Sequence, residues 1–226
     1  MRAPFIYAPP PGAIDVRYVD DHYVVVEKPA GLLSVPGKAA DHGDCVETRV
    51  QCQFADARIV HRLDLDTSGL MVMARTAQAH RRLSQQFERR EVRKRYVARI
   101  WGRPMSPVGT NVQPLRCDWA RRPRQMVDYA NGKSAETRWH ILASDARSSL
   151  IALYPRTGRS HQLRVHMAEI GHPILGDRFY ADEAALAMSS RMLLHAASLA
   201  FSHPESGAEV IYESAVPFNV SGVTGV

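Results

Sequence analysis

Cysteine is scarce in this sequence. Its 226 residues contain three cysteines, Cys45, Cys52 and Cys117. An odd number of cysteines without paired short spacings fits neither a disulfide framework nor a zinc site. We therefore expect three reduced thiols, as is usual for a cytoplasmic protein.

Long apolar runs are also missing. No stretch is long enough to cross a membrane as a helix. The N-terminus reads Met-Arg-Ala-Pro-Phe and lacks the apolar run of a secretory signal. The sequence thus predicts a cytoplasmic protein without a membrane partner.

The motifs that hold nucleotides or metals are absent as well. We find no phosphate-binding loop and no dinucleotide-binding glycine pattern. His161 and His166 lie close in sequence, but no acidic residue stands at a ligand spacing and there is no His-Glu-x-x-His. We expect neither a cofactor nor a metal.

The remaining composition is that of a globular, modestly basic protein. Hydrophobic residues make up 45% of the chain, the net charge is +6 and arginine greatly outnumbers lysine. This length fits one domain, which we expect at residues 15–218, after an extended arm at 1–14 and before a frayed tail at 219–226. The charge fits a polyanionic partner, although many soluble enzymes are equally basic.

The most informative segment covers residues 61–75. It begins His-Arg-Leu-Asp-Leu-Asp-Thr-Ser-Gly, which is typical of a loop, and continues with the apolar run of residues 70–74, which predicts a short buried strand. Asp64 would then lie on a loop with a rigid support, where catalytic carboxylates are often placed. Taken alone, Asp64 or Asp66 is equally explained as the cap of a turn.

Residues 61–70 resemble the signature of the RluA-type RNA pseudouridine synthases, and the similarity extends over roughly residues 13–218. The resemblance implies that Asp64 is the catalytic aspartate and that Arg62 contacts RNA at the mouth of the cleft. It also implies that Lys-Pro-Ala-Gly-Leu at residues 28–32 packs beside the catalytic loop, with Lys28 as a secondary candidate for RNA contact.

A second signature, Arg-Thr-Gly-Arg-Ser-His-Gln-Leu-Arg-Val-His, occupies residues 156–166. Alternation from Ser160 predicts an extended segment with Gln162, Arg164 and His166 on one face. A short helix is expected at residues 167–170. The resemblance implies that Arg164 pairs with the catalytic aspartate.

Residues 93–102 alternate basic and apolar side chains, which predicts a half-buried strand with Tyr96, Ala98 and Ile100 on one face. A tyrosine in this position is ordinarily part of the core. The resemblance implies that the ring of Tyr96 lies against the target base, and one ring can serve both purposes.

Residues 104–124 form a basic segment rich in loop-forming residues. Arginines beside a tryptophan suit single-stranded RNA, through charge and stacking, although a basic surface loop explains them as well. Cys-Asp-Trp at residues 117–119 and its surroundings resemble the RluA branch of the family. We therefore assign RNA binding to Arg62, Arg116, Arg121, Arg122, Arg124 and Arg159.

The order of predicted elements indicates an α+β fold, with several strands and few helices. One of these helices should start after Thr76 as its cap and carry Ala79, Leu83 and Phe87 on its apolar face. The resemblance implies a bent, mixed and largely antiparallel sheet with flanking helices and a central RNA-binding cleft.

The reaction implied by the resemblance is the isomerisation of specific uridines to pseudouridine in stem-loops of 23S ribosomal RNA, the tRNA anticodon arm, or both. The target base must be flipped out of its stack, and the enzyme is expected to act as a monomer on RNA alone. Two alternatives stay open. The chain could be a catalytically silent RNA-binding or assembly factor, or Asp64 and Asp66 could form a hydrolytic pair.

Overall fold

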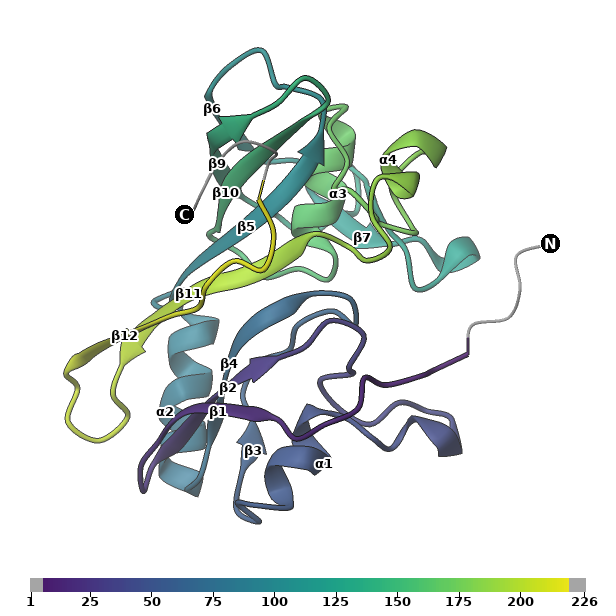
Figure 1. Cartoon of the computed structure of the whole chain (residues 1–226). Coiled ribbons are helices and arrows are strands. Elements are labelled where there is room, and N and C mark those ends of the chain that lie inside the picture. Colours follow the sequence, from purple (N-terminus) through teal and green to yellow (C-terminus); the bar gives the residue numbers. More distant parts are fainter. Residues whose placement is uncertain (1–5, 220–226) are drawn as a thin grey trace. The chain divides into compact units, whose positions relative to one another are not determined.

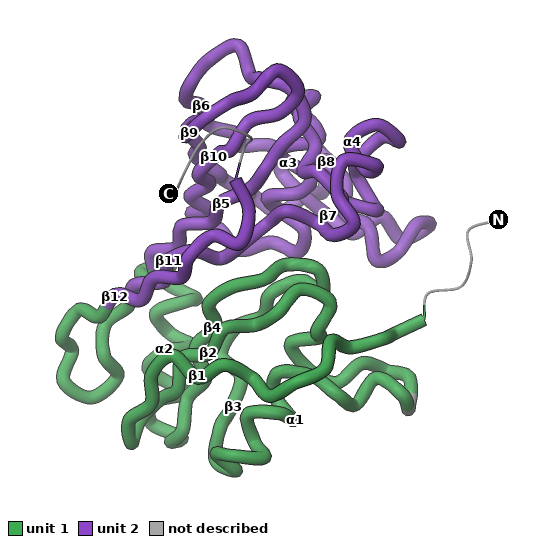
Figure 2. Tube along the Cα trace, in the orientation of Figure 1, with its two compact units in different colours: residues 1–92, 201–210 green, residues 93–200, 211–226 purple. Residues whose placement is uncertain are grey.

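The computed structural model describes residues 6–219 and divides the chain into two compact units. Unit 1 contains residues 1–92 and 201–210, and unit 2 contains residues 93–200 and 211–226 (Figure 2). The expectations for residues 1–5 and 220–226 lie outside the described residues. The elements of each unit are labelled in Figure 1.

Unit 1 is built on antiparallel strands in the order β1–β2–β4, with the short β3 paired to β4. All seven residues of β4 are buried, which confirms the buried strand predicted at residues 70–74, but β4 begins at Ser68 and so includes two residues that were predicted to form a turn. The elements are β1 (Asp15–Val19), β2 (Tyr23–Lys28), a 3-10 turn (Ala40–His42), α1 (Val46–Gln51), β3 (Arg58–Ile59), β4 (Ser68–Ala74) and α2 (Ala77–Glu88).

Helix α2 begins where the sequence predicted. The hydroxyl of Thr76 accepts a hydrogen bond from the Ala79 N–H at 3.0 Å, which satisfies a donor at the helix start. Ala79 and Leu83 are buried, and α2 packs on β4 through this apolar face. The expected amphipathic helix is confirmed.

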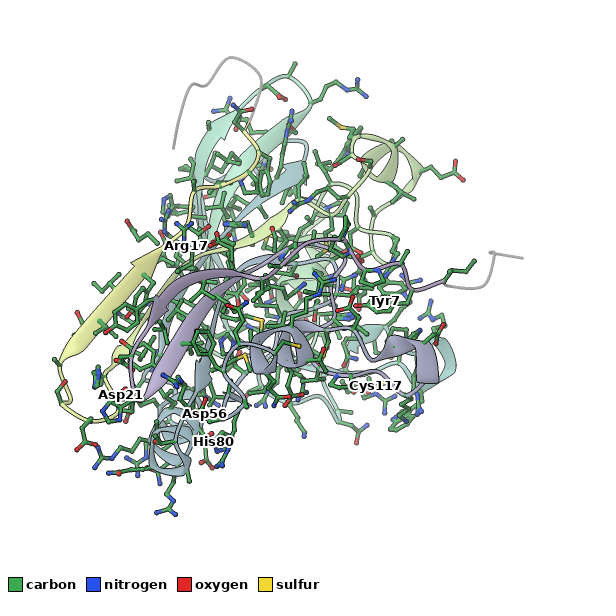
Figure 3. All side chains as sticks on the ribbon, turned by 60° about the horizontal axis from the view of Figure 1, so that its bottom comes forward. Tyr7, Arg17, Asp21, Asp56, His80 and Cys117 are labelled. Carbon is green, nitrogen blue, oxygen red and sulfur yellow. The ribbon has the colours of Figure 1, made fainter. Side chains whose placement is uncertain are left out.

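The proline-rich arm before β1 is attached to unit 1 by specific contacts. The hydroxyl of Tyr7, labelled in Figure 3, donates to the Asp44 carbonyl at 2.7 Å and accepts from the Leu33 N–H at 3.0 Å. Arg49 of α1 donates to the carbonyls of Pro10 and Gly12. These bonds hold the extended arm without a helix or strand of its own.

Unit 2 contains antiparallel strands in the order β11–β5–β10–β9–β6, and β7 and β8 form a separate two-stranded ribbon. Strand β12 pairs with β11. The elements are β5 (Arg93–Trp101), β6 (Val108–Asn111), β7 (Leu115–Cys117), a 3-10 turn (Trp119–Arg121), β8 (Gln125–Val127), β9 (Thr137–Ser144), β10 (Ser148–Pro155), α3 (Gln162–Glu169), α4 (Glu183–Ala187), β11 (Leu194–Ser202) and β12 (Glu209–Glu213).

The core of unit 2 lies where α3 meets the strands. Ala98 and Ile100 of β5 cluster with Leu163 and Met167 of α3, and Tyr96 packs against the same cluster. The predicted face of β5 is therefore confirmed. Antiparallel strands with few helices also confirm the α+β class.

A buried histidine makes the stability of unit 2 dependent on pH. His195 on β11 is 1% exposed and hydrogen-bonds through Nε2 with the Ser214 hydroxyl at 2.9 Å. Burial, helped by the charge of Arg191, lowers the pKa of His195 to about 4. The folded state thus binds this proton less well than the unfolded chain, so stability is lost as the pH falls from about 6.5 towards 4.

We expect the titration of His195 to lower the free energy of unfolding by about 2 kcal/mol when the pH is lowered from 7.5 to 5. This corresponds to a fall in Tm of roughly 6 °C. The measurement is thermal unfolding of the wild type and His195→Gln at both pH values. The variant should start less stable but lose fewer degrees on acidification. Equal losses in the two proteins would show that other groups carry the acid sensitivity.

Candidate active site

The loop at residues 61–67 connects to β4 and is held in place by Ser34. The Ser34 hydroxyl donates to the Leu63 carbonyl at 2.7 Å and accepts from the Leu63 N–H at 3.1 Å. Both groups are buried, so this reciprocal pair satisfies the backbone one residue before Asp64. The chain of Asp64 is therefore fixed on its N-terminal side.

The segment at residues 28–32 fixes the other side of Asp64. The carbonyl of Leu65 accepts from the Lys28 ammonium and from the Gly31 N–H, each at 2.9 Å. Lys28 is fully buried and also donates to the carbonyls of Pro29 and Leu32. The packing predicted for this segment is confirmed, whereas the suggestion that Lys28 contacts RNA is wrong because its ammonium is enclosed.

His61 joins the start of the loop to β4 and α2. Its Nε2 accepts from the Val72 N–H at 3.1 Å, and its ring stacks on Phe87 with centroids 4.5 Å apart. Asp64 is half-buried and Arg62 is exposed. Unit 1 therefore presents a carboxylate on a loop that is held by the ring of His61 and by the backbones of Leu63 and Leu65.

The second signature forms a helix, so the extended segment predicted from Ser160 is wrong. Helix α3 covers Gln162–Glu169, and every residue from Gln162 to Met167 is buried. The helix expected at residues 167–170 is the end of α3. Alternation failed as a guide because the polar residues of this segment are buried beside the apolar ones.

Each buried polar side chain of α3 has specific partners. The side-chain amide of Gln162 bonds the hydroxyls of Thr157 and Thr137. His166 bonds Thr137 and the Gln113 carbonyl, and burial lowers the pKa of its imidazole. Hydrogen bonding thus replaces apolar contact along one side of the helix.

Arg164 is the central polar residue of unit 2. It is 2% exposed, and its Nε and Nη2 donate to the two carboxylate oxygens of Asp177 at 2.7 and 2.8 Å. This forked pairing fixes the plane of the guanidinium. The rings of Phe179 and Tyr180 lie 5.2 Å from its central carbon.

Asp177 and Tyr180 are residues that the sequence analysis missed. Asp177 is fully buried and also accepts the N–H groups of Phe179 and Tyr180. The Tyr180 hydroxyl bonds His161 Nδ1 and the Gln125 N–H, each at 2.7 Å, and so links α3 to β8. An acidic residue next to Gly176 was the available signal, but pairing across 13 residues cannot be read from local patterns.

Tyr96 lies half-buried in the middle of β5, between Leu153 of β10 and Ala196 of β11. Lys94 lies two residues earlier on the same face of the strand. Its ammonium is close to Gly158 in the Arg-Thr-Gly turn, 3.9 Å from where a Cβ would lie, and burial lowers its pKa. The second signature therefore meets the face of β5 that carries Tyr96.

The arginines assigned to RNA have different surroundings. Arg116 pairs with Asp128 and Arg121 with Asp118, while Arg122 stacks on Trp119 and Arg124 lies over Tyr180. Arg159 is half-buried and donates to the Ser134 carbonyl at 3.1 Å. Arg62 and Arg122 are thus the two assigned arginines that are exposed and form no ion pair within residues 6–219.

The three residues with predicted catalytic roles are divided between the units, with Asp64 in unit 1 and Tyr96 and Arg164 in unit 2. Cys45, Cys52 and Cys117 are free thiols. In the part of the chain that the structure describes, no cluster of His, Cys, Asp and Glu could bind a metal ion. The helices between residues 6 and 219 are all too short or too polar to span a bilayer.

Comparison with known proteins identifies the family. The model of the RNA pseudouridylate synthase family matches residues 22–169. The dual-specificity RNA pseudouridine synthase RluA of Escherichia coli K12 is 50% identical over 204 residues, which cover 90% of this chain and 93% of that protein. RluA of Yersinia pestis is also 50% identical, over 90% of this chain and 99% of its own.

Solved structures agree with this result. The human RNA pseudouridylate synthase domain containing 1 has a TM-score of 0.78 and 27% identity, covering 93% of this chain and 87% of its own. Domain containing 4 has a TM-score of 0.72 and 26% identity, covering 90% and 88%. With a family model over more than half of its length and relatives at 50% identity, the chain belongs to the RNA pseudouridylate synthase family and is an isomerase of uridine in RNA.

Proposed function

We propose that this enzyme isomerises specific uridines in stem-loops of 23S ribosomal RNA, of the tRNA anticodon arm, or of both, with Asp64 as nucleophile. The observation that supports this proposal most directly is the loop of Asp64, whose backbone is fixed on one side by Ser34 and on the other by Lys28 and Gly31. Its relatives are named dual-specificity enzymes, which supports more than one RNA target.

The proposed chemistry exchanges one bond for another. The bond between C1′ of the ribose and N1 of uracil breaks, the base turns, and C1′ rejoins through C5. The proton on C5 leaves and N1 gains one, so no redox cofactor and no energy input are needed. Asp64 acts as nucleophile on the sugar or as base, and therefore has to be ionised.

We assign Arg164 to stabilise the ionised carboxylate of Asp64. A guanidinium beside a carboxylate favours its ionised form. Asp177 engages Nε and Nη2 and thereby orients the whole group in the core of unit 2. We assign the charge of Arg164 to the stabilisation of the ionised Asp64, so that Asp177 acts as a positioning residue.

Tyr96 and Arg62 are assigned to the base. The position of Tyr96 in a packed strand gives its ring a fixed orientation, which suits stacking on the detached uracil. We assign its hydroxyl a part in the loss of the C5 proton. Arg62 is exposed on the catalytic loop, where it would fill the space that the flipped uridine leaves in the RNA.

The turn between β7 and β8 is the proposed RNA-binding surface of unit 2. Trp119 is 71% exposed, and the guanidinium carbon of Arg122 lies 4.2 Å from the centre of its ring. Large exposed aromatic rings beside arginines are typical of sites that stack unpaired bases. Leu115 and Val127 anchor the ribbon against Val165 of α3, so the turn has a rigid base.

Trp119→Ala is expected to weaken binding of a stem-loop RNA about tenfold, because it removes one stacking surface worth roughly 1–3 kcal/mol. The measurement is the Kd by fluorescence anisotropy, alongside Tm. Tm should not change because the ring is exposed, and Trp119→Phe should restore most of the affinity. Unaltered binding by Trp119→Ala would remove this turn from the RNA surface.

The same proposal covers partners and location. We place the enzyme in the cytoplasm as a monomer that acts on RNA without a protein partner. A silent assembly factor is not favoured, because binding alone does not require Asp64, Tyr96 and Arg164 together. A hydrolase is not favoured because the family is one of isomerases.

The substrate is tested by single-turnover conversion of a synthetic 23S hairpin and an anticodon stem-loop, beside full-length RNA and assembled ribosomal subunits. Loop bases are cheaper to flip than paired ones, so we expect an isolated stem-loop to suffice. Binding should weaken steeply with salt. Activity confined to assembled subunits would contradict the proposal and imply a protein partner on the ribosome.

A further inference from the structure

The C-terminal end of α2 carries a strained arginine. Arg90 has φ = 61°, in the left-handed region, and is not a glycine. Its N–H bonds the Phe87 carbonyl at 3.2 Å, and the Glu91 N–H bonds the Gln86 carbonyl at 2.9 Å. This is a Schellman cap, in which the left-handed position strongly prefers glycine.

The cap is also exposed. Arg89 and Arg90 are both exposed, and neither forms an ion pair within the described residues. Glu88 and Glu91 flank them without neutralising them through a salt bridge. A non-glycine residue with a strained backbone, whose side chain forms no ion pair within residues 6–219, offers the fold no evident benefit over glycine, which points to a role outside the fold.

The catalytic loop lies next to this helix end. Phe87, one turn before the cap, stacks on His61 with ring centroids 4.5 Å apart. His61 directly precedes Arg62, the exposed arginine of that loop. Arg90 follows Phe87 by three residues, just beyond the end of α2. The stacked pair His61–Phe87 therefore joins two exposed arginines of unit 1.

We propose that Arg90 at the end of α2 is a phosphate-binding residue that holds the RNA backbone beside the nucleotides that Arg62 contacts. This deepens the proposed function, on which it rests. The ligand is a backbone phosphate diester rather than a base, because an exposed guanidinium suits forked contacts to phosphate oxygens. Its contribution is independent of RNA sequence.

The test uses Arg90→Gly, which separates folding from binding because the two effects have opposite signs. Glycine relieves the left-handed strain, so Tm should rise by about 2 °C. Loss of one phosphate contact should weaken RNA binding roughly fivefold and lower the slope of log Kd against log salt by about 1. Arg90→Lys keeps the charge and should retain most of the affinity.

The matched control is Arg81→Ala, which removes an exposed arginine in the same helix, about 9 Å before Phe87. Binding is measured in the Asp64→Asn background with a labelled stem-loop at several salt concentrations, so that no turnover occurs. Arg81→Ala should bind like its parent. If wild-type enzyme forms no pseudouridine in this RNA, the proposed function fails, while the binding comparison still stands.

Three results would overturn the inference. The first is unchanged affinity in Arg90→Gly. The second is an equal loss in Arg81→Ala, which would mean that net charge alone matters. The third is a lower Tm in Arg90→Gly, which would show that the arginine serves the fold.

Discussion

Replacing Asp64 by asparagine is expected to reduce pseudouridine formation by about 10⁴-fold or more, because it removes the charge that reacts while keeping the shape. RNA affinity should stay within about threefold, since phosphate contacts supply most of it. The loop should keep its structure, because Ser34, Lys28 and Gly31 bond the backbone around position 64 rather than its side chain. Single-turnover kinetics and binding on the same hairpin measure both effects.

Asp66→Asn is the matched control, two residues away on the same loop and also half-buried. It should retain most of the activity, because no step of the proposed reaction uses Asp66. An inactive Asp66 variant beside an active Asp64 variant would reverse the assignment. Inactivity of both, with normal binding, would revive the idea of a carboxylate pair.

The second large effect concerns Arg164. Removing its charge, as in Arg164→Met, leaves Asp177 buried without its partner, at a cost of about 3–5 kcal/mol. A loss of activity in that variant would therefore mix chemistry with unfolding. Arg164→Lys keeps the charge but loses the forked geometry, and we expect kcat to fall about 100-fold while the protein stays folded at 20 °C.

The measurement is kcat at saturating RNA for Arg164→Lys, together with Tm. Asp177→Asn is the companion variant, because it keeps Arg164 but weakens its orientation. It should lower both Tm and kcat, with kcat affected less than in Arg164→Lys. Wild-type kcat in Arg164→Lys would show that another cation holds Asp64, and Arg159 and Arg62 would be examined first.

The sequence predicted unit 1 well because its patterns are local. Thr76 caps a helix whose buried residues recur every four positions, and β4 is a continuous apolar run. In these elements apolar character and burial coincide, so periodicity indicates structure directly. The loop of Asp64 follows from the same logic, since it directly precedes a turn signal and a buried strand.

Helix α3 shows where this reasoning fails. Gln162, Arg164 and His166 alternate with apolar residues, yet all are buried, because Thr137, Thr157 and Asp177 supply their hydrogen bonds. Thr137 and Asp177 lie 25 and 13 residues away from Gln162 and Arg164, the side chains that they bind. The alternation of polar and apolar residues in this segment therefore indicated which side chains are polar, but not which are exposed.

Two further features could not be predicted from the sequence. Asp177, the partner of Arg164, is specified by a contact in space. The left-handed conformation of Arg90 is specified by the cap that ends α2, and its sequence lacks the glycine that normally signals such a cap. Resemblance to the family identified Asp64, Tyr96 and Arg164 as catalytic candidates. Local sequence patterns alone would have assigned Asp64 to a turn.

The central claim is that Asp64 drives isomerisation rather than hydrolysis or binding alone. The most direct measurement is nucleoside and free-base analysis of a synthetic stem-loop after incubation with wild-type enzyme and with Asp64→Asn. We expect pseudouridine to replace uridine one for one at unchanged RNA mass, only with the wild type and without free uracil. Free uracil with an abasic RNA, or equal pseudouridine from both proteins, would contradict the account.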